Sequence, residues 1–147
     1  MLENANTAIV RRWFEELWNQ RRLETIDELL GEDVRCYDMT APDSIIDSKA
    51  AFRAAAEQMY AAFGEIQMTV EDIFGVDDRV AVRLTGRLKH TGPLGPVSAT
   101  GADITVPIMC ILHLREGKLI AGWNNWDIAT VLRTAQAPTT QTALFPA

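Results

Sequence analysis

The sequence is poor in the residues and motifs of the commonest catalytic machineries. It holds only two cysteines and two histidines in 147 residues, and no CxxC, HExxH, Gly-rich phosphate loop or GxSxG motif. Metal, nucleotide and serine-hydrolase chemistry are therefore disfavoured. Cys36 and Cys110 both lie in apolar strand patterns, so we expect buried free thiols in the reducing cytosol of a cytoplasmic protein.

Positive charge and long apolar runs are also scarce. A net charge of -6 argues against nucleic acid or an anionic membrane as the partner, because phosphate binding favours a basic face. No apolar run approaches the ~20 residues that span a bilayer. The N-terminus lacks the basic start and the following apolar run of a secretory signal, so we expect no such signal. The length fits one domain, which we place at residues 1–136, with a flexible Pro- and Thr-rich tail at 137–147.

The spacing of apolar residues changes from a helical period to alternation along the chain. Helical spacing predicts three helices, at residues 7–18, at 23–30, and after a Ser48 cap up to Phe63. A strand at 34–38 and a loop at 39–47 separate the last two. Alternation then predicts strands at 66–76, 80–88, 104–114 and 118–127, and a short helix follows at 128–135. Helices followed by antiparallel strands indicate an α+β domain with the helices on one face of the sheet.

The strand at 104–114 is apolar at nearly every position from Val106 to Leu112. A strand that is apolar on both faces is covered on both faces. The helices can cover one face, and we expect a second subunit to cover the other, which predicts a homodimer.

The turn at Glu116-Gly117 sets the predicted register of the last two strands. A two-residue turn pairs Leu114 with Leu119, Leu112 with Ala121, Cys110 with Trp123, Ile108 with Asn125, and Val106 with Asp127. This register predicts that Trp123, Asn125 and Asp127 face the core. It also places His113 on the opposite face, which disfavours a His113–Asp127 dyad.

The same phase argument places other polar residues toward the predicted cavity. Asp38 is in phase with the inward-facing Val34 and Cys36, whereas Tyr37 is out of phase. His90 is in phase with the apolar residues of its own strand. The helices carry the aromatic residues that would cover such a cavity: Trp13, Trp18 and Tyr60.

Each candidate has a structural alternative. Asp127 is predicted to act either as a general base or as the cap of the helix that follows it. Asp38 is a second acid/base candidate or a solvated loop residue, and His90 is a proton donor or a histidine bonded by the adjacent loop. Trp123, Asn125 and Tyr37 are candidate substrate contacts; Asn125 could equally bond Asp127. Trp18 and Tyr60 are candidates for the substrate site or for the core.

The chain resembles the SnoaL-like polyketide cyclase group of the nuclear transport factor 2-like superfamily from about Thr7 to Ala135. The resemblance rests on the segments VRRWFEELWNQRRLETIDELLGEDVRCYD, TVEDIFGVDDRVAVRLTGRLKHTG, ATGADI and REGKLIAGWNNWDIATVLR. It implies a curved antiparallel sheet wrapped in a cone around a pocket and the N-terminal helices, and a homodimer through the outer face of the sheet.

The resemblance also implies a reaction. In the founding cyclases an aspartate near the end of the last strand removes a proton next to a carbonyl, and the enolate closes a ring without cofactor or metal. Asp127 matches that aspartate, and Asp38 lies where related ketosteroid isomerases carry a base. The strand from Ile104 lacks the Arg-x-Asp pair of limonene-epoxide hydrolases, which argues against that reaction.

Two hypotheses follow. One is a cofactor-independent cyclase or isomerase that acts on a hydrophobic carbonyl compound, with Asp127 as base and His90 or Asn125 stabilising the enolate oxygen. The other is a non-catalytic dimeric domain that binds a small apolar ligand or a protein.

Overall fold

The computed structural model describes residues 4–127, 130–131 and 133–134. The helices are α1 (Ala5–Arg12), the π-helix η1 (Trp13–Asn19), α2 (Glu24–Leu29) and α3 (Lys49–Ala62). The strands are β1 (Leu30–Asp38), β2 (Ala41–Ile46), β3 (Phe63–Val76), β4 (Arg79–His90), β5 (Asp103–Arg115) and β6 (Lys118–Trp126). The tail predicted at 137–147 lies outside the described residues.

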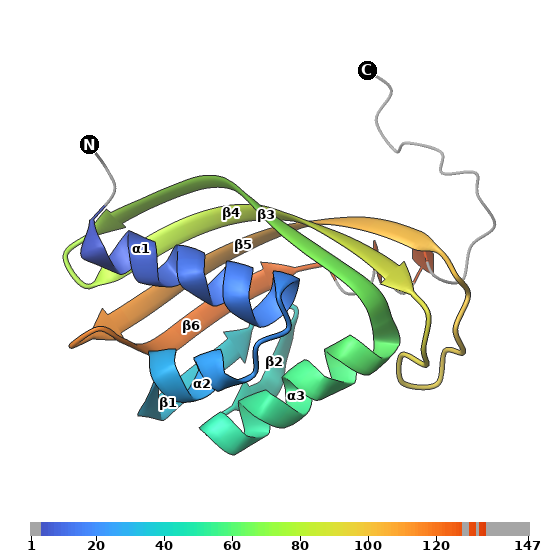
Figure 1. Ribbon diagram of the computed structural model, residues 1–147, viewed down its shortest axis with the longest axis horizontal. Coiled ribbons are helices and arrows are strands. Elements are labelled where there is room, and N and C mark those ends of the chain that lie inside the picture. The colour runs from blue at the N-terminus through green and yellow to red at the C-terminus, as the bar shows by residue number, and fades with distance from the viewer. Residues whose placement is uncertain (1–3, 128–129, 132, 135–147) are drawn as a thin grey trace.

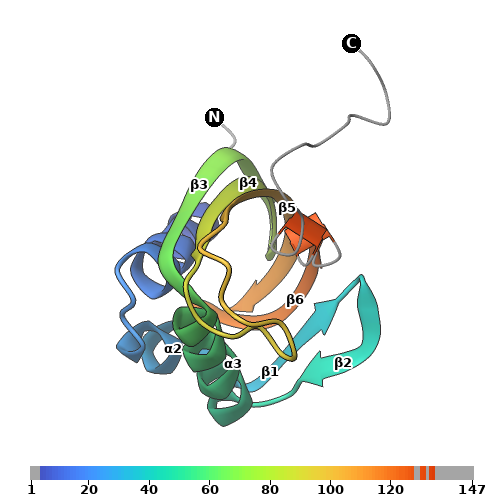
Figure 2. The same cartoon turned by 90° about the vertical axis from the view of Figure 1, so that its right-hand side faces the viewer.

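The six strands form one curved sheet in the order β2-β1-β6-β5-β4-β3. Neighbouring strands are antiparallel except β1 and β6, which run parallel. The helices lie against one side of this sheet (Figure 1), and the sheet curls into the cone seen end-on in Figure 2. The predicted α+β cone is confirmed.

Local hydrogen bonds fix where the helices begin. Asn4 Oδ1 accepts the Thr7 backbone N–H at 3.0 Å, and Thr7 Oγ1 accepts the Asn4 N–H at 2.8 Å, forming a capping box. Ser48 Oγ accepts the Ala51 N–H at 3.0 Å, as predicted for the start of α3.

The first predicted helix has wider turns in its second half. Gln20 N–H donates to the Glu15 carbonyl, five residues back, at 3.0 Å, which is the π-helical pattern. A turn of this width brings residues five apart toward the same side of the helix. Trp13 and Trp18, five residues apart in η1, stand in this relation.

The core lies between the concave face of the sheet and the helices. Burial alternates strictly along β5, where the even-numbered residues are buried. On the outer face Met109 is 62% and Ile111 51% exposed in the single chain. No helix among the described residues is long and apolar enough to cross a membrane.

The loop predicted at 39–47 is wrong, because residues Ala41–Ile46 form strand β2. Among the described strands β2 pairs only with β1, through Cys36–Ile46, Tyr37–Ile45 and Asp38–Ala41. An edge strand tolerates Pro42, because a proline that donates no ladder hydrogen bond can sit where no neighbouring strand follows. The loop was predicted because Pro42 is unusual inside a strand.

Candidate active site

A cavity of about 680 Å³ lies between the concave face of the sheet and the helices η1 and α3. This volume is within the range of small-molecule sites in proteins. Most of its wall is apolar and is formed by aromatic, aliphatic and sulfur-containing side chains: Trp13, Phe14, Trp18, Leu30, Val34, Cys36, Ile46, Phe52, Met59, Met68, Leu94, Ile108, Cys110, Leu112, Leu119 and Trp126.

Asp38 is the only charged residue among those that line this cavity in the described part of the chain. Its side chain is half-buried at the end of β1. Oδ1 accepts hydrogen bonds from the Thr40 backbone N–H at 2.8 Å and from Thr40 Oγ1 at 2.6 Å. These two bonds fix the carboxylate, while no described residue hydrogen-bonds its Oδ2. As a lining residue, Asp38 faces the inside of the sheet, as predicted.

A β-bulge changes the predicted register of the last two strands. The two-residue turn is present, with positive φ at both Glu116 and Gly117 and with Arg115 opposite Lys118. Leu114 still pairs with Leu119, but His113 pairs with Ala121, so Ile120 is an extra residue on β6. Beyond it every pairing is shifted by one.

The shift corrects the predicted positions of Trp123 and Asn125. Cys110 pairs with Asn124 and Ile108 with Trp126, so the prediction of Trp123 opposite Cys110 and Asn125 opposite Ile108 is wrong. A shift of one residue moves every following side chain to the other face of a strand. Asn124 and Trp126 accordingly line the cavity.

Trp123 lies in an aromatic cluster on the outer face. It stacks on Tyr37 with ring centroids 5.3 Å apart and an interplanar angle of 16°, and its centroid is 4.8 Å from that of His113. The predicted separation of His113 from Trp123 is therefore wrong. Tyr37 is among the residues around the cavity, but its ring belongs to this cluster, in agreement with its predicted phase.

Asp127 has the geometry of a helix cap. Oδ1 accepts the Thr130 backbone N–H at 2.9 Å, Oδ2 accepts the Thr130 hydroxyl, and the Asp127 carbonyl accepts the Val131 N–H at 3.1 Å. The residue is exposed and is not among those that line the cavity. Of the two predicted roles, the cap is the one that these contacts serve.

Asn124 is a polar cavity residue that the sequence did not single out. It is the direct cross-strand partner of Asp38 on β1, and its carbonyl accepts the Met39 N–H at 2.8 Å. Side chains of directly paired residues share a face, so Asn124 and Asp38 face the same side of the sheet, and both line the cavity. Gly122 was the available sequence signal, because a glycine inside a strand often accompanies a bulge.

His90 is fully buried at the end of β4 but is not a cavity residue. Its Nδ1 lies 2.9 Å from Thr100 Oγ1, and its backbone exchanges hydrogen bonds with Gly101 and Ala102. The adjacent loop therefore holds it, as its structural alternative predicted. Its Nε2 is buried without a partner among the described residues.

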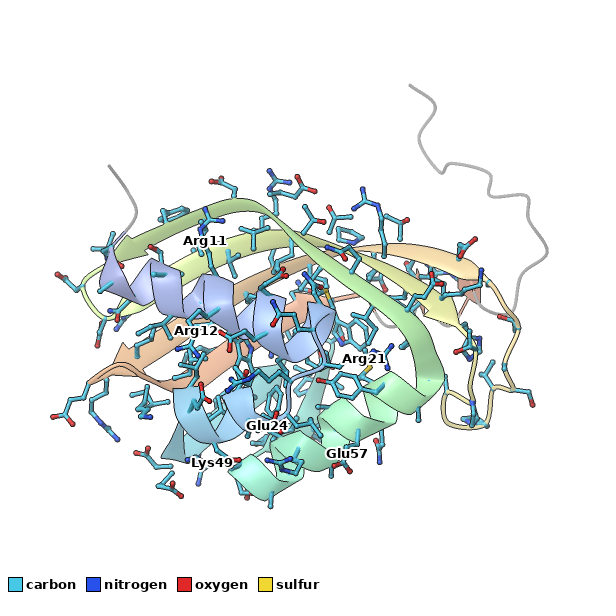
Figure 3. The ribbon with its side chains drawn as sticks, viewed as in Figure 1. Arg11, Arg12, Arg21, Glu24, Lys49 and Glu57 are labelled. Carbon is cyan, nitrogen blue, oxygen red and sulfur yellow. The ribbon has the colours of Figure 1, made fainter. Side chains whose placement is uncertain are left out.

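Trp18 lines the cavity, whereas Tyr60 is not a lining residue and packs against Trp18. The two rings meet edge to face with centroids 6.0 Å apart, and the Tyr60 hydroxyl donates to the Leu17 carbonyl. Arg21, labelled in Figure 3, lies over the Tyr60 ring, with its guanidinium carbon 5.0 Å from the ring centroid. Burial raises the pKa of the Tyr60 hydroxyl, so it stays a protonated donor. These contacts hold Trp18 in place.

The cavity also contains the two free thiols, Cys36 and Cys110. Burial raises the pKa of each thiol to about 12, so both are uncharged near neutral pH. Among the described residues no group of three or more His, Cys, Asp or Glu side chains could hold a metal ion.

The family model for SnoaL-like polyketide cyclase matches residues 8–135. Solved structures with the same fold include a candidate SnoaL-like polyketide cyclase from Jannaschia sp. CCS1, which is 21% identical, with a TM-score of 0.84 over 93% of this chain and 95% of that one. IdmH from Streptomyces antibioticus, a candidate polyketide cyclase, is 23% identical with a TM-score of 0.78 over 91% and 100%. AclR from Streptomyces galilaeus, a candidate hydroxylase, is 25% identical with a TM-score of 0.76 over 90% and 97%. No curated protein is similar to this chain in sequence.

Proposed function

The chain belongs to the SnoaL-like polyketide cyclase family, and from this premise we propose that it catalyses an intramolecular aldol ring closure of a hydrophobic carbonyl compound. One observation carries the proposal: among the described lining residues one carboxylate, Asp38, lies with a paired amide residue, Asn124, in a cavity whose wall is otherwise mostly apolar. Such a cavity binds an apolar molecule, and its few polar groups orient the reacting end.

In the proposed reaction Asp38 is the general base. Its Oδ2, which accepts no hydrogen bond from the described residues, takes a proton from the carbon next to a substrate carbonyl, and the electron pair of that C–H bond forms an enolate. The enolate carbon attacks a second carbonyl of the same molecule, forming a C–C bond and an alkoxide. The protonated Asp38 returns its proton to the alkoxide. Substrate and product are isomers, so the reaction balances without an oxidant, a reductant or a second substrate.

In the proposed reaction Asn124 stabilises the enolate. Its side-chain N–H groups donate hydrogen bonds, and its backbone position is fixed by pairing with both β1 and β5. Donors that are already oriented toward a developing oxyanion lower the barrier without rearrangement during the reaction. The pair Asp38–Asn124 thus supplies a base and an oxyanion partner from adjacent strands.

Asp38→Asn tests this assignment, with Asp127→Asn as the matched variant. The assay follows deuterium incorporation into the methyl group of 2-acetylnaphthalene, an apolar ketone with exchangeable α protons, by NMR in D2O. Asp38→Asn is expected to slow exchange by about 10²- to 10⁴-fold, the usual contribution of a general base. Asp127→Asn is expected to stay within about twofold of the unaltered protein.

The reverse result would assign the base to Asp127, the position that the family resemblance favours. A third result would favour a domain that binds ligands without catalysis. In that case 2-acetylnaphthalene binds, as detected by quenching of tryptophan fluorescence, but the unaltered protein and both variants exchange its α protons only at the buffer rate.

We also propose that the outer face of the sheet forms a homodimer. An apolar row crosses all six strands through directly paired residues: Ile45, Tyr37, Trp123, Ile111, Ala81 and Phe74. Ile45, Ile111 and Phe74 are 47%, 51% and 43% exposed. A contiguous exposed apolar surface of this kind marks an interaction site, and a second copy of the same row is self-complementary across a twofold axis.

A further inference from the structure

Gly122 differs from every other glycine of the chain. Among the nine glycines, five would place a Cβ within 3.2 Å of a neighbouring atom and three have a positive φ. The five are Gly31, Gly64, Gly75, Gly86 and Gly92, and the three are Gly95, Gly101 and Gly117. At Gly122 φ is ordinary, and a Cβ would meet its nearest atoms, Cys36 Sγ and Leu112 Cδ2, at 4.0 Å. Neither the backbone nor the packing of the protein requires a glycine there.

The missing side chain opens the floor of the cavity. Gly122 pairs with Cys36 on β1 and with Leu112 on β5, and all three line the cavity. Strands lie about 4.8 Å apart, so the two flanking side chains start roughly 10 Å from each other. Between them the bare backbone of Gly122 leaves a slot bounded by Cys36 Sγ and Leu112 Cδ2.

This slot lies one row deeper than the proposed reacting groups. Asp38 and Asn124 form the next inward-facing row, two residues along β1 and β6 from Cys36 and Gly122. Two residues along a strand span roughly 7 Å, about the length of one fused ring beyond the reacting carbonyl. Across the cavity, the Trp13 and Phe52 rings meet edge to face at 5.1 Å and supply an aromatic wall.

We infer that Gly122 sets the size of the substrate: a flat, fused-ring end lies over Gly122 while the carbonyl end lies at Asp38 and Asn124. The inference rests on the proposed function for the position of the carbonyl end. Glycine is often found in strands where a ligand approaches the backbone closely, and here it leaves room for the ring that a side chain would displace.

The test compares three aryl methyl ketones with one, two and three rings: acetophenone, 2-acetylnaphthalene and 2-acetylanthracene. Affinity is measured by quenching of tryptophan fluorescence, because Trp13, Trp18 and Trp126 line the cavity. Gly122→Val is expected to weaken binding of the three-ring ketone at least tenfold and to leave the affinity for acetophenone within about twofold.

Gly122→Ala, whose methyl group fits at 4.0 Å, is expected to give an intermediate effect and guards against a folding defect in the valine variant. Ala54→Val, on the exposed face of α3, is the control and is expected to bind all three ketones like the unaltered protein.

Three results would overturn the inference. Gly122→Val could weaken the binding of all three ketones equally, it could weaken the binding of none, or the unaltered protein could bind none of them. Failure of the proposed function has a different signature. In that case the ring-size dependence persists in the binding assay, while the unaltered protein exchanges no α protons above the buffer rate.

Discussion

Ile120 and Gly122 lie two residues apart on β6 and together decide which side chains reach the cavity. The extra residue at Ile120 turns Asn124 and Trp126 inward and Trp123 and Asn125 outward. The glycine then leaves the floor open beside them. Two residues without a catalytic group therefore shape the site around Asp38.

The reactivity of the two thiols is a prediction at the scale of single residues. With pKa values raised by burial from 9.0 to about 12, Cys36 and Cys110 hold about a thousandth of the thiolate of an ordinary cysteine at pH 8, and the thiolate is the nucleophile. In the native protein we expect almost no reaction with Ellman's reagent at pH 8. In guanidinium chloride both thiols are expected to react fully. A native thiol that reacts at the denatured rate would contradict this placement, in which Cys110 is buried and Cys36 is half-buried in the cavity wall.

The short helical elements are held together by a ring of charges. Glu16 on η1 accepts hydrogen bonds from Arg12, from Arg22 at 3.0 Å and from Thr25 Oγ1 at 3.2 Å, and Glu28 on α2 binds the same two arginines. Figure 3 shows Arg12 between α1 and α2. The hydrogen bond from Arg12 is the main cause that lowers the pKa of Glu16, and hydrogen bonds from Arg22 and then Arg12 lower the pKa of Glu28 to about 2. This network links elements that are too short to be stable alone.

Glu16→Gln tests the network at the scale of these elements. Its side chain is largely shielded, so we expect a loss of about 1 kcal/mol in the free energy of unfolding at pH 7. Because folding lowers the Glu16 pKa below its ordinary 4.5, its contribution is present above that pH and is lost as the pH falls. Urea unfolding at pH 7 and pH 3 should therefore show a difference between variant and unaltered protein that shrinks at pH 3.

Glu57→Gln is the control for this measurement. Glu57 is exposed on α3 and forms no ion pair with the described residues (Figure 3). Its replacement is expected to change the free energy of unfolding by less than about 0.5 kcal/mol at either pH. A gap between Glu16→Gln and the unaltered protein that is as large at pH 3 as at pH 7 would assign the effect to packing rather than to charge.

At the scale of the whole molecule, the helices cover the concave face of the sheet and leave the convex face open in a single chain (Figure 1). The apolar row across the six strands lies on this open face. An exposed apolar surface of this kind marks an interaction site, which supports the proposed dimer. Dimerisation and ligand binding would then use opposite faces of the same strands.

Ile111→Lys tests the proposed dimer at the centre of the row. A charge there must be desolvated at the interface, so we expect the variant to be a monomer by light scattering at concentrations where the unaltered protein is a dimer. Val76→Lys is the matched control, because Val76 is 63% exposed at the end of β3, outside the row. A monomeric unaltered protein at high concentration would refute the dimer.

The sequence by itself determined the α+β class, the Ser48 cap, the two-residue turn at Glu116-Gly117 and the inward phase of Asp38. Each depends on local periodicity or local hydrogen bonds, which the order of residues specifies directly. Only the tertiary structure decided the strand β2 and the faces of Trp123, Asn124 and Asn125. The extra residue at Ile120 bends β6, and the one local signal of it, the glycine at Gly122, does not specify which residue is the extra one. The identity of the polar pair in the cavity, Asp38 with Asn124, is a consequence of that bend.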